Sequence, residues 1–127
     1  MPKAIDYAKV FMKRDLDSAR NTFDGNMKLQ KLLFFADYIS LATRNCRLFD
    51  DAVYAFRNGC VVESVRTRYK NDFQSLRRDC ERFEPNFTEE EYEVINLTSA
   101  IFGELSAREL SQLNHSFDFW KKRHNSL

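Results

Sequence analysis

Histidine, cysteine and carboxylate side chains are the first candidates for chemistry in this 127-residue chain, and they are sparsely arranged. The only histidines are His115 and His124, too few for an all-histidine metal site. His115 precedes Asp118 by three residues, so the two could form an acid–base pair. Packing or capping near a helix end is the structural alternative for His115, and we favour it. No nucleophile elbow, phosphate-binding loop or His-Glu-x-x-His motif occurs, so we expect no enzyme, no catalytic residue and no metal site.

Three cysteines, Cys46, Cys60 and Cys80, are widely spaced and form no Cys-x-x-Cys pair. This pattern is typical of reduced thiols in a cytosolic protein and argues against a disulfide framework or a metal template. Cys60 lies beside Gly59 and ahead of a predicted helix, where a thiol can become acidic. Because no basic partner is identifiable nearby in the sequence, we interpret Cys60 as structural. No cofactor is expected.

Basic residues gather between positions 66 and 82 and are the best candidates for binding a partner: Arg66, Arg68, Lys70, Arg77, Arg78 and Arg82. The guanidinium fork of arginine suits carboxylates and phosphates. Acidic residues interleave with these basic ones, which is also typical of a helix face that meets only solvent. The net charge of +1, from 20 basic and 19 acidic residues, gives no general attraction to nucleic acid or to an anionic membrane. Solvated face, protein-binding surface and nucleic-acid-binding surface are therefore three open interpretations.

Helices must position these residues, and the central one is predicted over residues 26–43. Apolar residues recur there at steps of three and four, and aromatic residues, Tyr38 among them, widen the apolar face. Asp24 or Asn26 could cap its start. A helix that is apolar around so much of its girth normally lies in the middle of a domain. With 12 Phe but only 3 Gly and 2 Pro, the sequence predicts a mainly α, single compact domain over residues 1–127.

The first half of the chain contributes one more helix and a short β element. A helix is predicted over residues 2–19, with Leu16 on its apolar stripe, and a loop over residues 20–25. Near residues 53–61 an extended piece leads into a turn at which Gly59 can take a positive φ.

The second half is predicted to be helical. An amphipathic pattern starts at Val61 and reaches about residue 83, and it can break near Asn71-Asp72. Two capping boxes open the remaining helices, Thr88-x-x-Glu91 and Ser106-x-x-Glu109. Gly103 is predicted to end the first of these helices as its C′ residue. No charged-then-apolar leader and no apolar run of membrane-spanning length occurs, which favours a cytoplasmic protein.

Three segments carry motifs in a recognisable order and spacing. The first, MKLQKLLFFADY (27–38), contributes Lys28, Leu29, Lys31 and Leu32. The second, residues 47–70, contributes Leu48, Phe49, Ala55, Phe56, Gly59, Val61, Val62 and Tyr69. The third, residues 105–120, contributes Leu110, Leu113, His115 and Trp120. Together they resemble the Panacea domain of SocA-like antitoxins, a family common in bacteria and their prophages.

Two positions depart from the pattern of that family. Its Gly-Pro pair is Gly59-Cys60 in this chain, and its Pro-Trp pair is Phe119-Trp120. Each change removes a proline and with it a fixed φ value in a loop. The two changes indicate a diverged member of the family and favour a changed partner.

The resemblance implies a mostly helical domain whose members neutralise a toxin encoded beside them, often by direct binding, and in one branch by delivery to a protease. It also implies that Gly59, His115 and Trp120 hold the shared fold, with the Gly59 turn packed near the loop from His115 to Trp120. Partner recognition would then fall on exposed positions that vary within the family, such as Arg66, Arg68, Arg77 and Arg78, and on the tail 121–124.

Three classes of function follow, and the preferred one is an antitoxin-like inhibitor that binds a protein partner, with no cofactor. A phage-encoded variant could instead inhibit a host defence protein such as a CRISPR effector. A nucleic-acid-binding regulator would use the basic helix face, and an enzyme would use His115 with Asp118 or Cys60. The near-neutral charge disfavours the regulator, and the missing catalytic constellation disfavours the enzyme.

Overall fold

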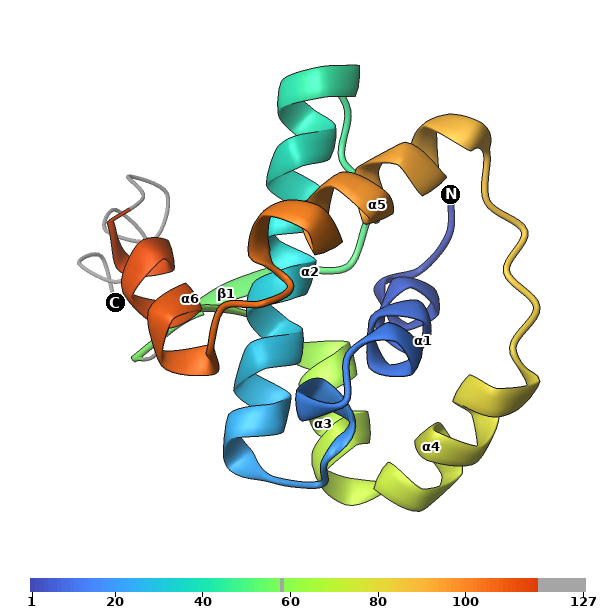
Figure 1. The fold of residues 1–127 in the computed structure, drawn as a ribbon, viewed down its shortest axis with the longest axis vertical. Coiled ribbons are helices and arrows are strands. Elements are labelled where there is room, and N and C mark those ends of the chain that lie inside the picture. The colour runs from blue at the N-terminus through green and yellow to red at the C-terminus, as the bar shows by residue number, and fades with distance from the viewer. Residues whose placement is uncertain (58, 117–127) are drawn as a thin grey trace.

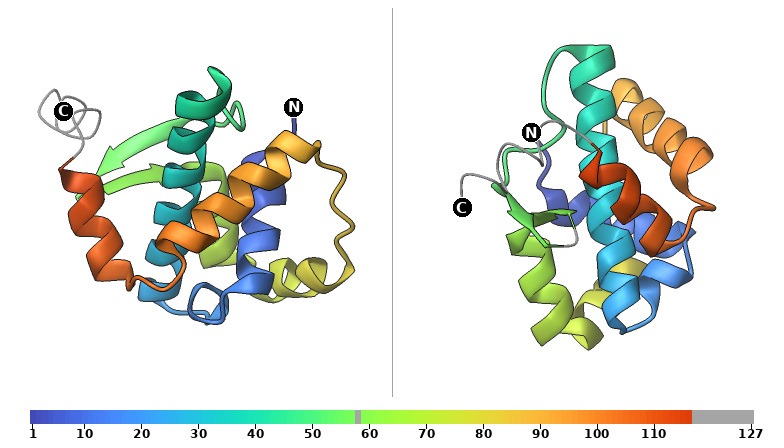
Figure 2. Two further views of the ribbon diagram at one scale, coloured as in Figure 1. Left: turned by 45° about the horizontal axis from the view of Figure 1, so that its top comes forward. Right: turned by 90° about the vertical axis from the view of Figure 1, so that its left-hand side faces the viewer.

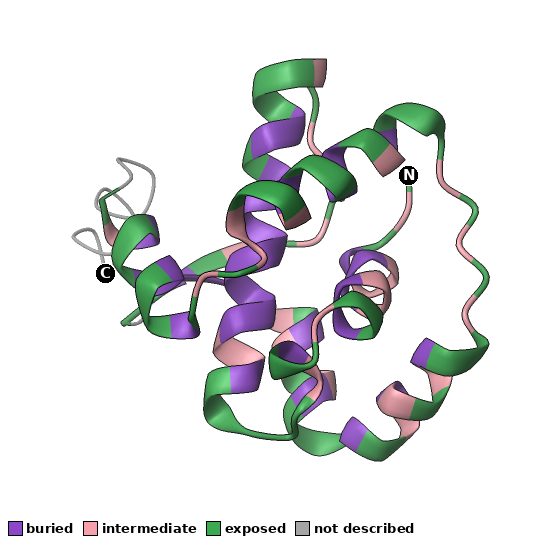
Figure 3. Ribbon diagram, viewed as in Figure 1, coloured by how far each residue is buried: buried purple, intermediate pink, exposed green. Residues whose placement is uncertain are grey.

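The computed structural model describes residues 1–57 and 59–116, and its longest helix, α2 (Phe23–Arg44), runs through the middle of the molecule (Figure 1). This helix is buried along most of its length (Figure 3). The predicted central helix is therefore confirmed. Tyr38 is the exception to the prediction, because its side chain is half exposed and does not widen the apolar face.

Helix α2 begins earlier than its apolar pattern predicts. Thr22 is the N-cap, and its hydroxyl oxygen accepts a hydrogen bond from the Gly25 N–H at 2.9 Å. The expectation that Asp24 or Asn26 would cap the helix is therefore wrong, and both lie inside it. The three extra residues are mostly polar or exposed, so hydrophobic periodicity gave no sign of them.

The first helix, predicted over residues 2–19, is the shorter α1 (Ala4–Arg14). Asp15 ends it, since its backbone is extended and its carboxylate accepts a hydrogen bond from the backbone of the short 3-10 turn η1 (Asp17–Ala19). Leu16 is 73% exposed, so its predicted place on the buried stripe is wrong. An aspartate that satisfies the next turn competes with helix continuation.

A two-stranded antiparallel hairpin of β1 (Val53–Phe56) and β2 (Gly59–Val62) confirms the predicted β element. Phe56 pairs with Gly59 at the turn, and Gly59 has the expected positive φ, at +119°. The predicted helix start at Val61 is wrong. All four residues of β2 are buried, and a continuous apolar run of this length suits a buried strand as well as a helix.

The basic stretch forms two helices, α3 (Glu63–Asn71) and α4 (Phe73–Arg82). The predicted break is confirmed at Asp72, whose φ of −141° and ψ of 41° lie outside the helical region. The two helices diverge beyond this residue, as Figure 1 shows. Basic residues of the two helices therefore do not share one continuous face.

Both predicted capping boxes are confirmed, at the starts of α5 (Glu89–Phe102) and α6 (Ala107–His115). Gly103 follows α5 as expected, although it keeps a right-handed φ of −61° and is the C-cap residue itself. Helices α5 and α6 both pack against α2, and α6 also contacts β2 (Figure 2).

Aromatic rings join these helices to the core. Phe35 of α2 stacks on Phe102 of α5 with ring centroids 4.3 Å apart, and Tyr7 of α1 stacks on Phe87 at 4.6 Å. The described residues thus form six α-helices and a small two-stranded sheet that lies beside α2, which confirms the predicted mainly α fold.

Candidate functional site

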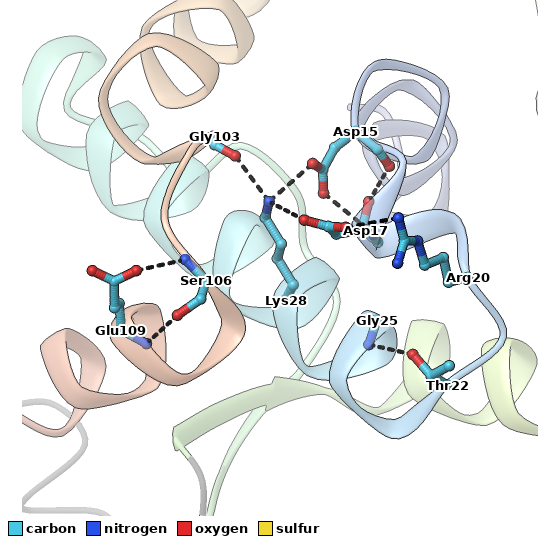
Figure 4. Close-up of polar contacts among 10 residues, drawn as sticks. Asp15, Asp17, Arg20, Thr22, Gly25, Lys28, Gly103, Ser106 and Glu109 are labelled. Carbon is cyan, nitrogen blue, oxygen red and sulfur yellow. Dashed lines mark hydrogen bonds and ion pairs between the residues drawn. The ribbon is translucent and has the colours of Figure 1, made fainter.

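Lys28 is a buried cation that connects three parts of the fold. Its side chain is only 4% exposed, and its Nζ donates to Asp15 Oδ1 at 2.9 Å and to the Gly103 carbonyl at 2.8 Å (Figure 4). The carboxylate of Asp17 lies further away, at 3.8 Å. Because these oxygens belong to the end of α1, to η1 and to the end of α5, Lys28 holds all three elements against α2. A lysine at this position of the motif therefore serves to hold the fold together.

Lys31, one turn further along α2, is buried without a matching carboxylate. It is 1% exposed, and its Nζ donates to the Cys60 carbonyl of β2 at 2.8 Å. No ion pair to it is found within residues 1–57 and 59–116. Burial lowers the pKa of Lys31 to about 8, since a low-dielectric site disfavours the charged ammonium.

Asn114 of α6 contacts the same strand close to Lys31. Its Oδ1 accepts the Cys60 N–H at 2.6 Å, and the residue is fully buried. Gly59 fits between the two side chains: a Cβ there would overlap Asn114 Oδ1 and lie 2.7 Å from Lys31 Nζ. Only glycine combines this space with a φ of +119°. The sequence-based interpretation missed Asn114, although it directly precedes His115 in the closing motif.

Most of the other motif residues lie in the interior, whereas Phe56 and Leu113 are 37% and 40% exposed. Leu29, Leu32 and Phe49 are at most 1% exposed, and Val61 is 7% exposed. The next residue of β2, Val62, donates its N–H to Gln30 Oε1 at 2.8 Å, a second α2 contact that the sequence did not reveal. These positions pack the core and anchor the hairpin to α2.

The candidate catalytic residues do not assemble into a described site. His115 is half-buried at the end of α6, while Asp118, Trp120 and the tail 121–124 lie outside the described residues. Cys60 has no exposed surface, so its thiol is inaccessible to reagents in solution. Within the described residues no group of three His, Cys, Asp or Glu side chains could hold a metal ion. No helix among them is both long and apolar enough to cross a membrane.

A cavity of about 420 Å³ opens between α2, the hairpin and α3, and we call it the α2–α3 groove. Its lining comes from four elements and the loop before α2: Asn21, Thr22, Phe23, Asn26, Met27, Gln30, Lys31, Phe56, Arg57, Val61, Arg66, Tyr69 and Lys70. Four of these residues are Lys or Arg, and none is Asp or Glu. The groove is therefore a local concentration of positive charge in a nearly neutral chain.

Aromatic side chains accompany these cations. Phe23 is 71% exposed and Phe56 is 37% exposed, and both exposed fractions are large for apolar side chains. The Arg66 guanidinium lies over the Phe56 ring at 5.2 Å and also pairs with Glu63 at 3.0 Å. Exposed aromatic and arginine side chains around a hollow are the composition found at protein-binding surfaces.

The six basic residues singled out in the sequence fall into separate groups. Arg66 and Lys70 line the groove, and Arg68 instead pairs with Asp79 of α4, a hydrogen bond that lowers the pKa of that carboxyl. The others, Arg77, Arg78 and Arg82, belong to α4 and do not line the groove. Arg57 and Phe23 were missed, and Phe56 was named only as a motif residue, because nothing in the local sequence shows which helix the hairpin meets.

These features define a mainly α-helical domain in which buried lysines hold the interior and a basic, partly aromatic hollow opens at the surface. A family model described as "Antitoxin SocA-like, Panacea domain" matches residues 29–121. That match covers most of the chain, so the protein belongs to the SocA-like antitoxin Panacea family, and the resemblance seen in the motifs is confirmed. No curated protein and no solved structure matches the chain significantly.

Proposed function

We propose that this protein is an antitoxin-like inhibitor that neutralises a partner protein, the toxin encoded beside it, by binding it directly. Membership of the Panacea family supports an antitoxin-like role. The observation that carries the proposal is the α2–α3 groove, which offers exposed aromatic and cationic side chains, while the motif lysines Lys28 and Lys31 are used inside the fold.

Direct binding fits the physical character of this surface. Interfaces derive most of their affinity from a few large aromatic and arginine anchors, and the remaining contacts mainly exclude water. Phe23 and Phe56 can supply apolar area, and Arg57 and Lys70 can supply charge. Neutralisation by blocking needs no chemistry on the partner, so it does not depend on His115 or Cys60.

The test is an affinity pull-down of the tagged protein from cells that also express the neighbouring gene, combined with a growth assay. We expect a stoichiometric complex with the neighbour's product and restored growth when that product is toxic. A tagged Gly59→Val variant, which should not fold, serves as the control for nonspecific capture.

Two results would overturn the proposal. Capture of a host or CRISPR protein, without the neighbour's product, would identify an inhibitor of host defence instead. Recovery of material that nuclease treatment removes, with affinity falling steeply as salt rises, would identify a nucleic-acid-binding regulator.

A further inference from the structure

The charged side chains that line the α2–α3 groove are all positive. Lys31 contributes at its inner wall, and Arg57, Arg66 and Lys70 contribute from the hairpin and α3. Arg57 and Lys70 are exposed, and within the described residues no ion pair joins either of them to a carboxylate. A ligand carboxylate that enters the groove therefore meets positive potential without a competing negative side chain in the lining.

The groove also has an apolar part, which is unfavourable to leave in contact with water. Phe23, Met27, Phe56 and Val61 line it, from both α2 and the hairpin. A volume of about 420 Å³ accommodates one or two side chains of a partner. Burial of an apolar side chain there would remove the exposed Phe23 and Phe56 rings from water.

Together these observations favour a peptide over a nucleic acid. Arg66 already pairs with Glu63 and Lys31 already donates to the Cys60 carbonyl, so the groove leaves two cations, Arg57 and Lys70, for a ligand. That number suits one or two carboxylates and not a continuous polyanion. The Arg66 guanidinium already lies over Phe56, so that ring face is occupied and cannot stack a base from the same side.

We propose that the α2–α3 groove receives an acidic segment of the partner protein, in which carboxylates flank an apolar side chain. The carboxylates pair with Arg57 and Lys70, and the apolar side chain packs between Phe23 and Phe56. This assignment deepens the proposed function and rests on it, because it identifies the surface and the chemistry through which the partner is held.

The test compares two charge reversals that change the net charge equally. R57E/K70E reverses two exposed groove residues, and R78E/R82E reverses two exposed residues on α4, outside the groove. A random peptide library displayed on yeast is selected on the wild-type protein, and the enriched peptides are measured by fluorescence anisotropy. Unfolding of both variants is followed in parallel, so that a loss of fold is not mistaken for a loss of binding.

We expect the selected peptides to carry acidic residues around an apolar one. Their affinity should fall at least about tenfold for R57E/K70E and change less than about twofold for R78E/R82E. Replacing the peptide carboxylates by lysine should restore binding to R57E/K70E. A library without an acidic consensus, equal losses for both variants, or displacement of the peptide by duplex DNA at low concentration would overturn the assignment.

The same variants separate this assignment from the proposed function. If the neighbour's product binds the wild type and still binds R57E/K70E equally well, the groove assignment fails while direct neutralisation stands. If no complex with the neighbour's product forms at all, the proposed function fails, whatever peptides the groove selects.

Discussion

Cationic side chains occur in two settings in this protein, the interior of α2 and the surface groove beside it. Inside, Lys28 and Lys31 are at most 3% exposed, and each donates to oxygens of the fold. In the groove, Arg57 and Lys70 are exposed, and no hydrogen bond or ion pair to their side chains is found within the described residues. The interior cations are thus committed to structure, whereas Arg57 and Lys70 of the groove are available to a partner.

The two interior lysines also differ from each other. Lys28 is matched by the Asp15 carboxylate, whereas Lys31 donates to the Cys60 carbonyl and has no carboxylate partner among residues 1–57 and 59–116. A buried charge without a counter-ion weakens the folded state unless it releases its proton. Motif positions that look equivalent in the sequence therefore differ in how their contribution to stability depends on pH.

Gly59→Ala should produce the largest loss of stability. The new Cβ would overlap Asn114 Oδ1, approach Lys31 Nζ and force a side chain into a φ of +119°. We expect the free energy of unfolding to fall by about 3 kcal/mol or more, measured by urea denaturation. Arg57→Ala, on the same hairpin, is the control and should change it by less than about 0.5 kcal/mol. Equal effects would show that the turn is not held as described.

Lys28→Met should cost slightly less, about 2–3 kcal/mol of unfolding free energy, because it leaves the Asp15 carboxylate without its buried partner. Lys13→Met, at an exposed position on α1, is the matched control. Equal unfolding free energies for the two variants would contradict the structural use of Lys28.

Lys31→Met should change the pH dependence of stability. In the folded protein Lys31 loses its proton near pH 8, whereas in the unfolded chain it keeps the proton up to the ordinary value of 10.5. The unfolded state therefore binds more protons between these values, and the stability of the wild type rises with pH there. Relative to Lys31→Met, the wild type should gain about 1–2 kcal/mol between about pH 7 and pH 9.5.

Urea denaturation of the wild type and of Lys31→Met at pH 7 and at pH 9.5 checks this prediction. A difference in unfolding free energy between the two proteins that is the same at both pH values would contradict it. The comparison must stop below pH 10. Burial raises the pKa of Tyr7 and Tyr69 above the ordinary value of 10.0, so these tyrosines reduce stability as the pH rises past that value.

R57E/K70E should have the smallest effect on stability. Both residues are exposed and without described partners, so the free energy of unfolding should change by less than about 0.5 kcal/mol, as thermal denaturation can show. A large loss would mean that the groove cations also hold the fold, and the distinction between the two regions would fail.

Local signals in the sequence predicted much of this architecture. The apolar girth of α2, the two capping boxes and Gly59 each depend on residues close in the chain, and the structure confirms them. The start of α3 was mistaken, because whether a short apolar run is a strand depends on the hairpin partner and on burial against α2. Arg57 and Asn114 were missed for the same reason, since their roles arise from contacts between distant segments.

The most direct test of the division between interior and groove is calorimetric titration of the purified product of the neighbouring gene into three proteins. These are the wild type, R57E/K70E and R78E/R82E, each first shown to unfold at the same temperature. We predict stoichiometric binding by the wild type and R78E/R82E, and affinity at least about tenfold weaker for R57E/K70E. Undiminished binding by R57E/K70E would contradict the groove as the partner-binding surface.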